Sequence, residues 1–185
     1  LKEIVGPAWL DRAQTKDATT LSHMVLLNTK DGFQAHPMNL WAQLTAGFSP
    51  SVTDANGDGH LDVLMSQNFF ATESRTPRQD AGRGLVLRGD GTGHFTPLKG
   101  HRTGLLAYGE QRAAPVADVD GDGRIDVLVT QNGADTRLFR NVGATPGLHV
   151  RLDGPAQNPR GIGATVRLRY DDGSRGPAVG ITAGS

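Results

Sequence analysis

Four aspartates fall within nine residues of the stretch "DVDGDGRIDVLVTQN", residues 118–132. Asp118, Asp120 and Asp122 occupy alternate positions, and Asp126 follows four residues later. Two carboxylates ~4 Å apart repel by roughly 4 kcal/mol at an effective dielectric constant of 20, so such a cluster needs compensation. A hard divalent cation supplies that compensation and takes carboxylate and carbonyl oxygens as its ligands. The spacing therefore predicts a cation site.

The same pattern occurs 64 residues upstream, in "DANGDGHLDVLMSQN", residues 54–68. Nine of the fifteen aligned positions are identical, and Asn56 with Asp120 and Leu61 with Ile125 are conservative differences. Self-similarity at a fixed spacing indicates a repeat architecture. We therefore expect two equivalent sites on two equivalent structural units.

Calcium fits this pattern because it accepts about six to eight oxygens, with loop position 7 contributing a backbone carbonyl. Gly59 and Gly123, at position 6, permit the sharp bend that such a loop requires. We predict two Ca²⁺ sites. The predicted ligands are Asp54, Asn56, Asp58, His60 (carbonyl) and Asp62 in the first loop, and Asp118, Asp120, Asp122, Arg124 (carbonyl) and Asp126 in the second.

An EF-hand, a magnesium site and a zinc site all fit these loops less well. An EF-hand needs a Glu at position 12 and flanking helices, whereas position 12 is Met65 or Val129 inside an apolar run. Magnesium prefers fewer protein ligands and more waters, and zinc prefers Cys or clustered His. An Asx-rich turn without a metal stays open as an alternative, because Asn-Gly and Asp-Gly are strong turn formers.

Short strands must hold these loops in place. Each unit is predicted to have a lead-in strand (Pro50–Thr53 or Pro115–Ala117), the acidic loop, an apolar strand ("DVLMSQN" or "DVLVTQN") and a third strand ("GLVLRGD" or "TRLFRNV"). The first unit continues to a fourth strand near Phe95, and "HMVLLNTKDGFQAHPM" resembles the last two strands of a preceding unit. Four antiparallel strands in about 60 residues are typical of a β-propeller blade, so the predicted class is all-β.

The two ends of the chain differ from the repeats. Residues 1–20 form a lead-in segment, in which "PAWLDRAQ" is predicted to be a short helix or a loop. Residues 21–146 hold the blades, one partial and two with calcium loops. Residues 147–185 form a separate β module, in which alternating residues predict a half-buried strand at "GLHVRLDG" and a hairpin turning at 171–173.

The stretch "YGEQRAAPVADVDGDGRIDVLVTQNG" resembles the FG-GAP or VCBS repeat, the calcium-loop blade of integrin alpha-subunit propellers and of many bacterial surface and secreted proteins. The tail, through "NPRGIGATV", resembles the start of an ASPIC/UnbV module. The first resemblance covers residues 21–146 and implies a seven-bladed propeller with calcium sites on the loops of one face. Because a propeller needs at least four blades, we expect this chain to be the C-terminal part of a larger protein, or to be completed by partner chains.

The composition argues against some classes of function. Lys plus Arg equals Asp plus Glu at 19 each, which argues against a nucleic-acid partner. There is no cysteine, and no apolar run approaches the ~18 residues that span a membrane. No catalytic motif is present outside the calcium loops. We therefore predict a calcium-binding scaffold, secreted, at the cell surface or periplasmic, that contacts a protein or glycan ligand. The alternatives are a polysaccharide-active enzyme whose site lies elsewhere and a subunit of a surface assembly.

A few further residues carry expectations. The amides of Gln67, Asn68, Gln131 and Asn132 end equivalent strands and are predicted to tie down the blade backbone. The polar insertion at 69–84, with Arg75, Arg78 and Arg83, is the best candidate contact surface, although a solvated loop explains it too. Trp9 and Trp41 are predicted to be packing residues. The histidines are scattered and make no metal-binding spacing.

Overall fold

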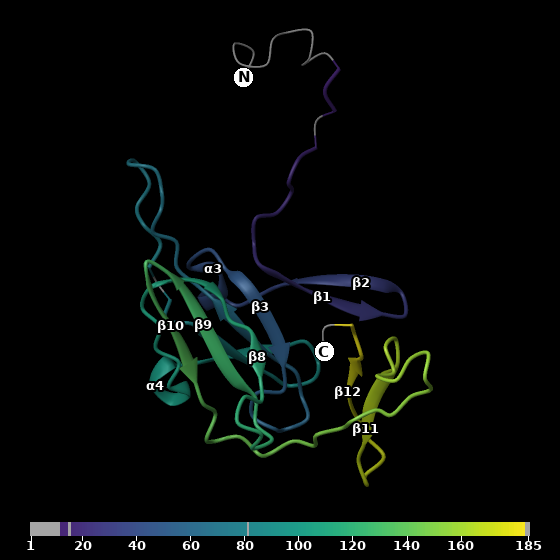
Figure 1. Cartoon of the computed structure of the whole chain (residues 1–185). Coiled ribbons are helices and arrows are strands. Elements are labelled where there is room, and N and C mark those ends of the chain that lie inside the picture. The colour runs from purple at the N-terminus through teal and green to yellow at the C-terminus, as the bar shows by residue number, and fades with distance from the viewer. Residues whose placement is uncertain (1–11, 15, 81, 184–185) are drawn as a thin grey trace.

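The architecture is all-β, with antiparallel sheets and two short helices, in a computed structural model that describes residues 12–14, 16–80 and 82–183. Two four-stranded sheets lie side by side (Figure 1). One two-stranded hairpin precedes them in the sequence, and another follows them. The described residues contain no closed propeller. Pro7 to Asp11, which include Trp9 and most of the predicted short helix, lie outside the described residues.

The first complete unit is a four-stranded antiparallel meander, as the repeat predicts. Its strands are β3 (Phe48–Thr53), β4 (Asp62–Ser66), β5 (Leu85–Gly89) and β6 (Phe95–Leu98), paired in that order. The lead-in strand starts two residues before the predicted Pro50, and its pairing shifts register between Phe48 and Ser51. Pro50 lacks the N–H that regular pairing needs, so the strand continues past it only with this irregularity.

The second unit has four strands among its described residues, and two of them share one position in the sheet. They are β7 (Glu110–Ala113) and β8 (Val116–Ala117), which pair with the same edge of β9 (Asp126–Asn132), and β10 (Ala134–Phe139) on the other edge of β9. The sequence predicted β8 but not β7. Ala114 and Pro115 interrupt what would otherwise be one strand, because proline cannot donate to the sheet.

The core has two parts, one on each face of the first sheet. Leu64 on β4 faces the second sheet and packs with Val129 of β9, whereas Val63 and Met65 face the opposite side. That opposite side is covered by Ala42 of α3 (Leu40–Gln43). A strand buried on both faces explains the continuous apolar run "DVLMS". Trp41, predicted to be a packing residue, is 54% exposed on α3, because Ala42 takes the inward position.

The flanking hairpins follow the sequence in part. β1 (Met24–Thr29) pairs with β2 (Gly32–Pro37), and β11 (Thr165–Arg169) pairs with β12 (Arg175–Gly180), as expected. The predicted strand at "GLHVRLDG" is wrong: residues 148–153 form no strand, and Leu148 is 75% exposed. Alternating apolar and polar residues predict which side chains share a face, but a strand also needs a neighbouring strand to pair with. No described sheet edge pairs with these residues.

The strand-end amides do tie the backbone, with one exception. Asn68 donates to the carbonyls of Gly82 and Gly109, and Gln67 donates to the carbonyl of Trp41. Gln131 accepts from the Gly109 N–H and donates to the carbonyl of Asp135. These contacts confirm the predicted role.

Asn132 differs because it donates to a carboxylate, Oε2 of Glu110, at 2.7 Å. Glu110 is buried where the two sheets meet, and its Oε1 accepts from the Phe70 N–H of the first unit at 2.8 Å. Arg112 pairs with the same carboxylate at 2.7 Å, and its guanidinium lies 4.5 Å from the Phe48 ring. No pattern in the sequence indicated this junction, because its partners are far apart along the chain.

The hydrogen bond from Asn132, together with those from the Phe70 and Ala71 amides and from Arg112, lowers the pKa of Glu110 from 4.5 to about 2. A pKa lower in the folded state than in the unfolded state means that ionised Glu110 stabilises the fold. That stabilisation is complete above pH 4.5 and is lost as the pH falls towards 2.

We expect Glu110→Gln to lower the melting temperature by several degrees at pH 7, since four charge-assisted contacts weaken together. The gap between wild type and variant should shrink as the pH falls from 4.5 towards 2, where Glu110 itself becomes protonated. Thermal melts followed by circular dichroism at several pH values check this. The exposed Glu73→Gln is the matched control, and a gap that stays constant with pH would contradict the assignment.

Candidate metal centre

Each acidic loop lies between two strands, as predicted. Residues 54–61 connect β3 to β4, and residues 118–125 connect β8 to β9. The glycines at loop positions 4 and 6 have positive φ in both loops: 76° and 87° at Gly57 and Gly59, and 76° and 82° at Gly121 and Gly123. Glycine adopts this region without steric cost, which explains its recurrence. The strand on either side excludes an EF-hand geometry.

The first aspartate of each loop collects backbone N–H groups. Asp118 accepts from Gly121 and Asp122 through Oδ1, and from Gly123 through Oδ2, at 2.8–3.1 Å. Asp54 accepts from the equivalent amides, those of Gly57, Asp58 and Gly59. These bonds are the ones expected of an Asx-rich turn, so the turn alternative describes part of the loop's structure. A carboxylate oxygen has further lone pairs, so the bonds leave acceptor capacity for a cation.

The ninth loop residue is a buried carboxylate that ties the loop to the third strand. Asp126 Oδ2 accepts from the Val119 N–H at 3.1 Å, and its Oδ1 accepts from the Asn141 N–H just beyond β10 at 2.9 Å. Asp62 makes the equivalent pair of bonds, from Ala55 at 3.0 Å and from Gly89 at 2.9 Å. The two residues are only 2% and 1% exposed, for Asp62 and Asp126 respectively.

Burial raises the pKa of Asp62 from its ordinary value of 3.8. The hydrogen bonds from Gly89 and Ala55 oppose this effect, and the nearby Asp58 and Asp54 carboxylates add to it. The raised pKa of Asp62 therefore reflects mainly the desolvation of a buried carboxylate, to which the two neighbouring negative charges add.

The structure gathers part of the predicted ligand set. Carboxylate oxygens of Asp118, Asp120 and Asp126 all lie within 4.8 Å of one another. Oxygens bound to one Ca²⁺ at ~2.3–2.6 Å can be no further apart than about 5 Å, so this trio fits a single calcium ion. Among the described residues, the first loop has no comparable trio of acidic or histidine side chains, since Asn56 stands where the second loop has Asp120.

Asp122 and its counterpart Asp58 are turned to other partners. Asp122 pairs with the Arg124 guanidinium at 3.0 Å and accepts the Arg124 N–H at 2.9 Å. Asp58 accepts from the Asn56 amide at 2.8 Å and from the His60 N–H at 3.0 Å. The predicted roles of these aspartates and of the His60 and Arg124 carbonyls as ligands therefore stay predictions.

Arginine compensates the second loop further. Arg140, just beyond β10, forms an ion pair with Asp120 Oδ2. With Arg124 on Asp122, two of the four carboxylates of this loop carry a guanidinium partner. The first loop has three carboxylates and no such ion pair among the described residues. Sequence reasoning missed both arginine contacts, although Arg124 lies inside the quoted loop.

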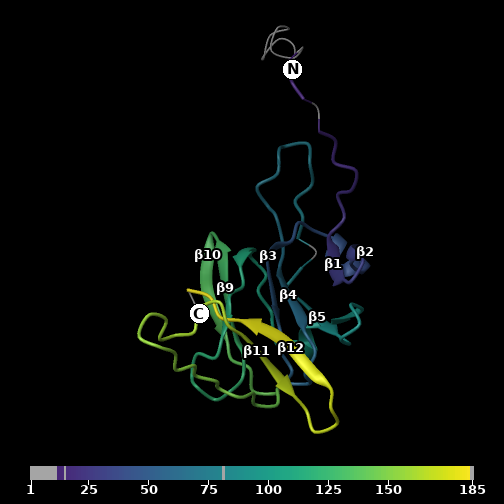
Figure 2. The ribbon, with the colours of Figure 1, turned by 90° about the vertical axis from the view of Figure 1, so that its right-hand side faces the viewer.

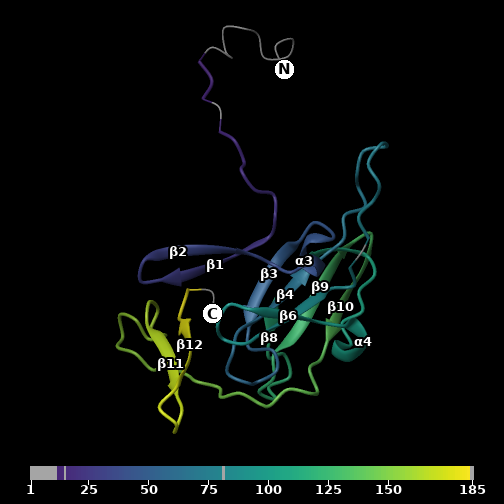
Figure 3. The ribbon, with the colours of Figure 1, turned by 180° about the vertical axis from the view of Figure 1, so that it is seen from behind.

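The segment after β10 connects the two loops. Asn141 donates to the Ala55 carbonyl of the first loop at 2.8 Å and to the Ile125 carbonyl at 3.2 Å. Thr145 then donates its N–H to the Asn56 carbonyl at 3.1 Å, and Gly147 donates to the Gly123 carbonyl at 2.7 Å. We call residues 141–147 the linker. It runs along one end of both sheets towards β11 (Figure 3).

The insertion at 69–84 extends away from the sheets as a long loop (Figure 2). An isolated bridge between Phe69 and Gln79 closes its base. Arg78 pairs with Asp80 at 2.8 Å and lies 4.5 Å from the Phe70 ring, and Arg83 lies 5.1 Å from the Tyr108 ring. Most of its described residues are exposed, and both the contact surface and the solvated loop stay predictions.

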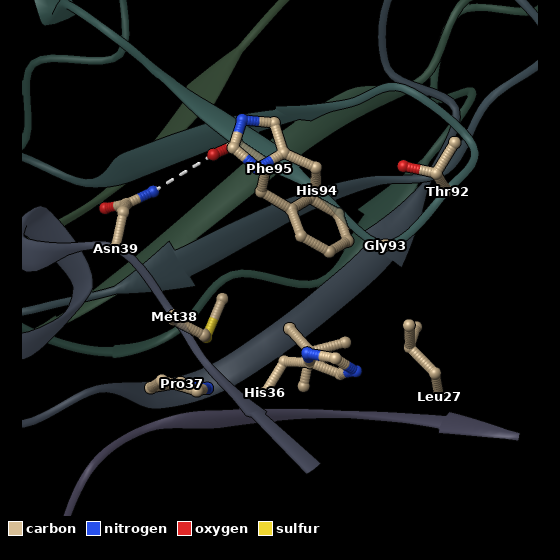
Figure 4. Close-up of a pocket in the computed structure, with 10 residues that line it drawn as sticks. Leu27, His36, Pro37, Met38, Asn39, Thr92, Gly93, His94 and Phe95 are labelled. Atoms are coloured by element: carbon tan, nitrogen blue, oxygen red, sulfur yellow. Dashed lines mark hydrogen bonds between the residues drawn. The ribbon is translucent and has the colours of Figure 1, made fainter. Parts of the chain in front are cut away.

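A cavity of about 360 Å³ lies between the β1–β2 hairpin and the turn before β6. His36 and His94 stand on opposite walls of it, with Met38 and Phe95 between them (Figure 4). The described lining holds no third histidine and no carboxylate or cysteine.

Comparison with known proteins supports an integrin-like repeat in part of the chain. No family model matches the sequence, and no solved structure matches it. Integrin alpha-IIb of Mus musculus is 30% identical over 138 residues, which cover 68% of this chain and 13% of the integrin. The chain thus corresponds to a small part of that relative's length. No described helix is long and apolar enough to cross a membrane.

Gly57 and Gly121 offer a matched test of the linker. Both have φ of 76°, so alanine at either position is strained by about 1 kcal/mol. A Cβ at Gly57 would also collide with the Thr145 carbonyl, whereas one at Gly121 meets nothing within 4 Å. We expect Gly57→Ala to lower the melting temperature clearly more than Gly121→Ala, measured in the same buffer. Equal losses would show that the linker does not pack firmly on the first loop.

Proposed function

We propose that this chain is a calcium-stabilised β-propeller scaffold of the FG-GAP type, with its blades followed by an ASPIC/UnbV-like β module. Calcium has a structural role in this proposal. The scaffold acts outside the cytoplasm, secreted, at the cell surface or in the periplasm, and presents loops to a protein or glycan ligand. The single observation that carries the proposal is the gathering of the Asp118, Asp120 and Asp126 carboxylates in a loop that occurs twice.

Asp118, Asp120 and Asp126 would hold calcium in the second loop, and Asp54, Asn56 and Asp62 are their counterparts in the first. When bound, the ion supplies positive charge to carboxylates that otherwise repel one another. The protein's own contribution is to fix the loop. Backbone N–H groups hold the first aspartate, and the buried ninth aspartate connects the loop to the third strand.

The likeness to an integrin alpha subunit and the sheet pairing support the blade interpretation. β3 to β6 form one complete four-stranded unit, and β7 to β10 contribute a second that packs against it. The exposed insertion at 69–84 is the proposed contact surface. Two of its arginines, Arg78 and Arg83, lie on aromatic rings at 4.5 and 5.1 Å, which holds cationic groups in place for an acidic partner.

Calcium affinity in the weak range of ~10⁻⁴–10⁻³ M suits an extracellular structural site. A ligand present at 100 times its Kd stabilises the folded state by about 2.7 kcal/mol per site. For a chain of this size, we expect EDTA to lower the melting temperature by about 5 °C or more relative to saturating Ca²⁺. Magnesium at the same concentration should restore less of the loss.

Asp118→Asn and Asp120→Asn isolate the second loop. Asp118→Asn should reduce the calorimetric stoichiometry from two Ca²⁺ per chain to one, and each of the two substitutions should reduce the EDTA-induced shift. Asp120→Asn reproduces the residue found in the first loop, so its loss should be the smaller of the two. Asp135→Asn, on the exposed face of β10, is the control. Absence of binding heat together with a melting temperature indifferent to EDTA would refute the calcium proposal and favour the plain turn.

A further inference from the structure

A second cavity, of about 520 Å³, lies between the two units and is separate from the acidic trio. Its floor is apolar and comes from both sheets and from the segment after residue 103: Leu64, Val86, Leu98, Leu105, Val127 and Phe139. Most of these side chains belong to, or pack against, the core that joins the units. The opening therefore leads from solvent directly to the inter-sheet core.

Three arginines line this cavity: Arg88 on β5, Arg102 on α4 (Gly100–Thr103), and Arg140. Asp62 is the one carboxylate in the described lining. Its oxygens already accept the Ala55 and Gly89 N–H groups, and it is almost completely buried. The cavity wall thus carries an excess of positive charge that the protein's own acidic groups do not balance.

The repeat explains where the excess originates. Arg88 and Arg140 are equivalent, because each directly precedes the residue whose N–H binds the buried aspartate, Gly89 or Asn141. Arg140 has a partner in Asp120. The residue equivalent to Asp120 is Asn56, which carries no charge and whose side chain is hydrogen-bonded to Asp58 at 2.8–2.9 Å.

Arg88 is therefore the copy of a paired arginine whose partner is missing. Both Arg88 and Arg102 are exposed, and neither forms an ion pair among the described residues. A guanidinium presents a planar fork of donors that suits a carboxylate.

We propose that this cavity binds a small organic carboxylate with an apolar body. The carboxylate pairs with Arg88 and Arg102 at the rim, and the apolar part covers the floor of leucine and valine side chains. The volume lies within the ~300–1,000 Å³ typical of small-molecule sites, which combine apolar linings with a few polar groups. The site borders the first acidic loop, whose Asn56 and Asp62 also line it, and the binding of an organic carboxylate goes beyond the proposed scaffold function.

The test uses the full chain and two matched probes, 4-phenylbutyrate and its neutral amide, 4-phenylbutyramide. Titration followed by ¹H–¹⁵N spectra should show saturable shifts near Leu64, Val127 and Arg88 with the carboxylate. The amide should bind about tenfold more weakly, because it cannot form the charge-assisted bonds. Inorganic phosphate, which lacks the apolar body, should bind more weakly than phenylbutyrate.

Arg88→Gln and Arg102→Gln should each weaken phenylbutyrate binding about tenfold while leaving the melting temperature unchanged, since both side chains are exposed. Arg88→Lys should give an intermediate loss, because it keeps the charge without the fork. Arg167→Gln, on the exposed face of β11, is the control and should bind like wild type. Equal affinity for acid and amide, or binding that survives both glutamine substitutions, would overturn the proposal, as would phosphate binding as tightly as phenylbutyrate.

Discussion

Asp62 and Asp126 are carboxylates with almost no contact with solvent, and a buried carboxylate costs several kcal/mol unless donors surround it. Each of these residues finds its donors in two places, an amide of its own loop and an amide at the end of the third strand. The same group therefore shapes the acidic loop and fixes where the third strand ends. Both units repeat this arrangement, so in each unit the conformation of the loop and the end of the third strand depend on the same buried carboxylate.

The junction between the units uses the same logic with other residues. Glu110 is buried where the sheets meet and is satisfied by amides of the neighbouring unit, by Asn132 and by Arg112. Apolar contacts between Leu64 and Val129 supply area, but they do not specify an orientation. The carboxylate does specify one, because its donors are backbone amides of the first unit and the side chains of Asn132 and Arg112 in the second. Polar groups thus determine how two largely apolar surfaces are aligned.

Sequence alone predicted what local spacing encodes. The duplicated loop, the strands on either side of it, the meander of the first unit and the 165–180 hairpin all agree with the structure, because each rests on a period or a turn signal. Alternation at 148–153 misled, since it says which residues share a face but not whether a neighbouring strand exists. The prediction for Trp41 was wrong for a similar reason. A large apolar side chain is buried only if its position on the helix faces the core, and on α3 that position belongs to Ala42.

The parts that could not be predicted depend on contacts between distant segments. Glu110 meets Phe70 across 40 residues, and Asn141 meets Ala55 across 86. No period in the sequence marks such pairs. Arg140 looked like an ordinary charged residue until the fold brought it to Asp120. The candidate site was therefore predicted in its residue types and loop positions, whereas its arginine partners and its attachment to the linker emerged only from the three-dimensional arrangement.

The linker also has a mechanical consequence. Its amides at Thr145 and Gly147 each donate to one carbonyl on an acidic loop, and the chain then continues to the C-terminal hairpin. Tension applied through that hairpin reaches these two hydrogen bonds, and the Tyr170 side chain beside Gly59, before it reaches the strands of the two units. The acidic loops are thus the anchorage of the C-terminal module, and their rigidity sets how much load the attachment withstands.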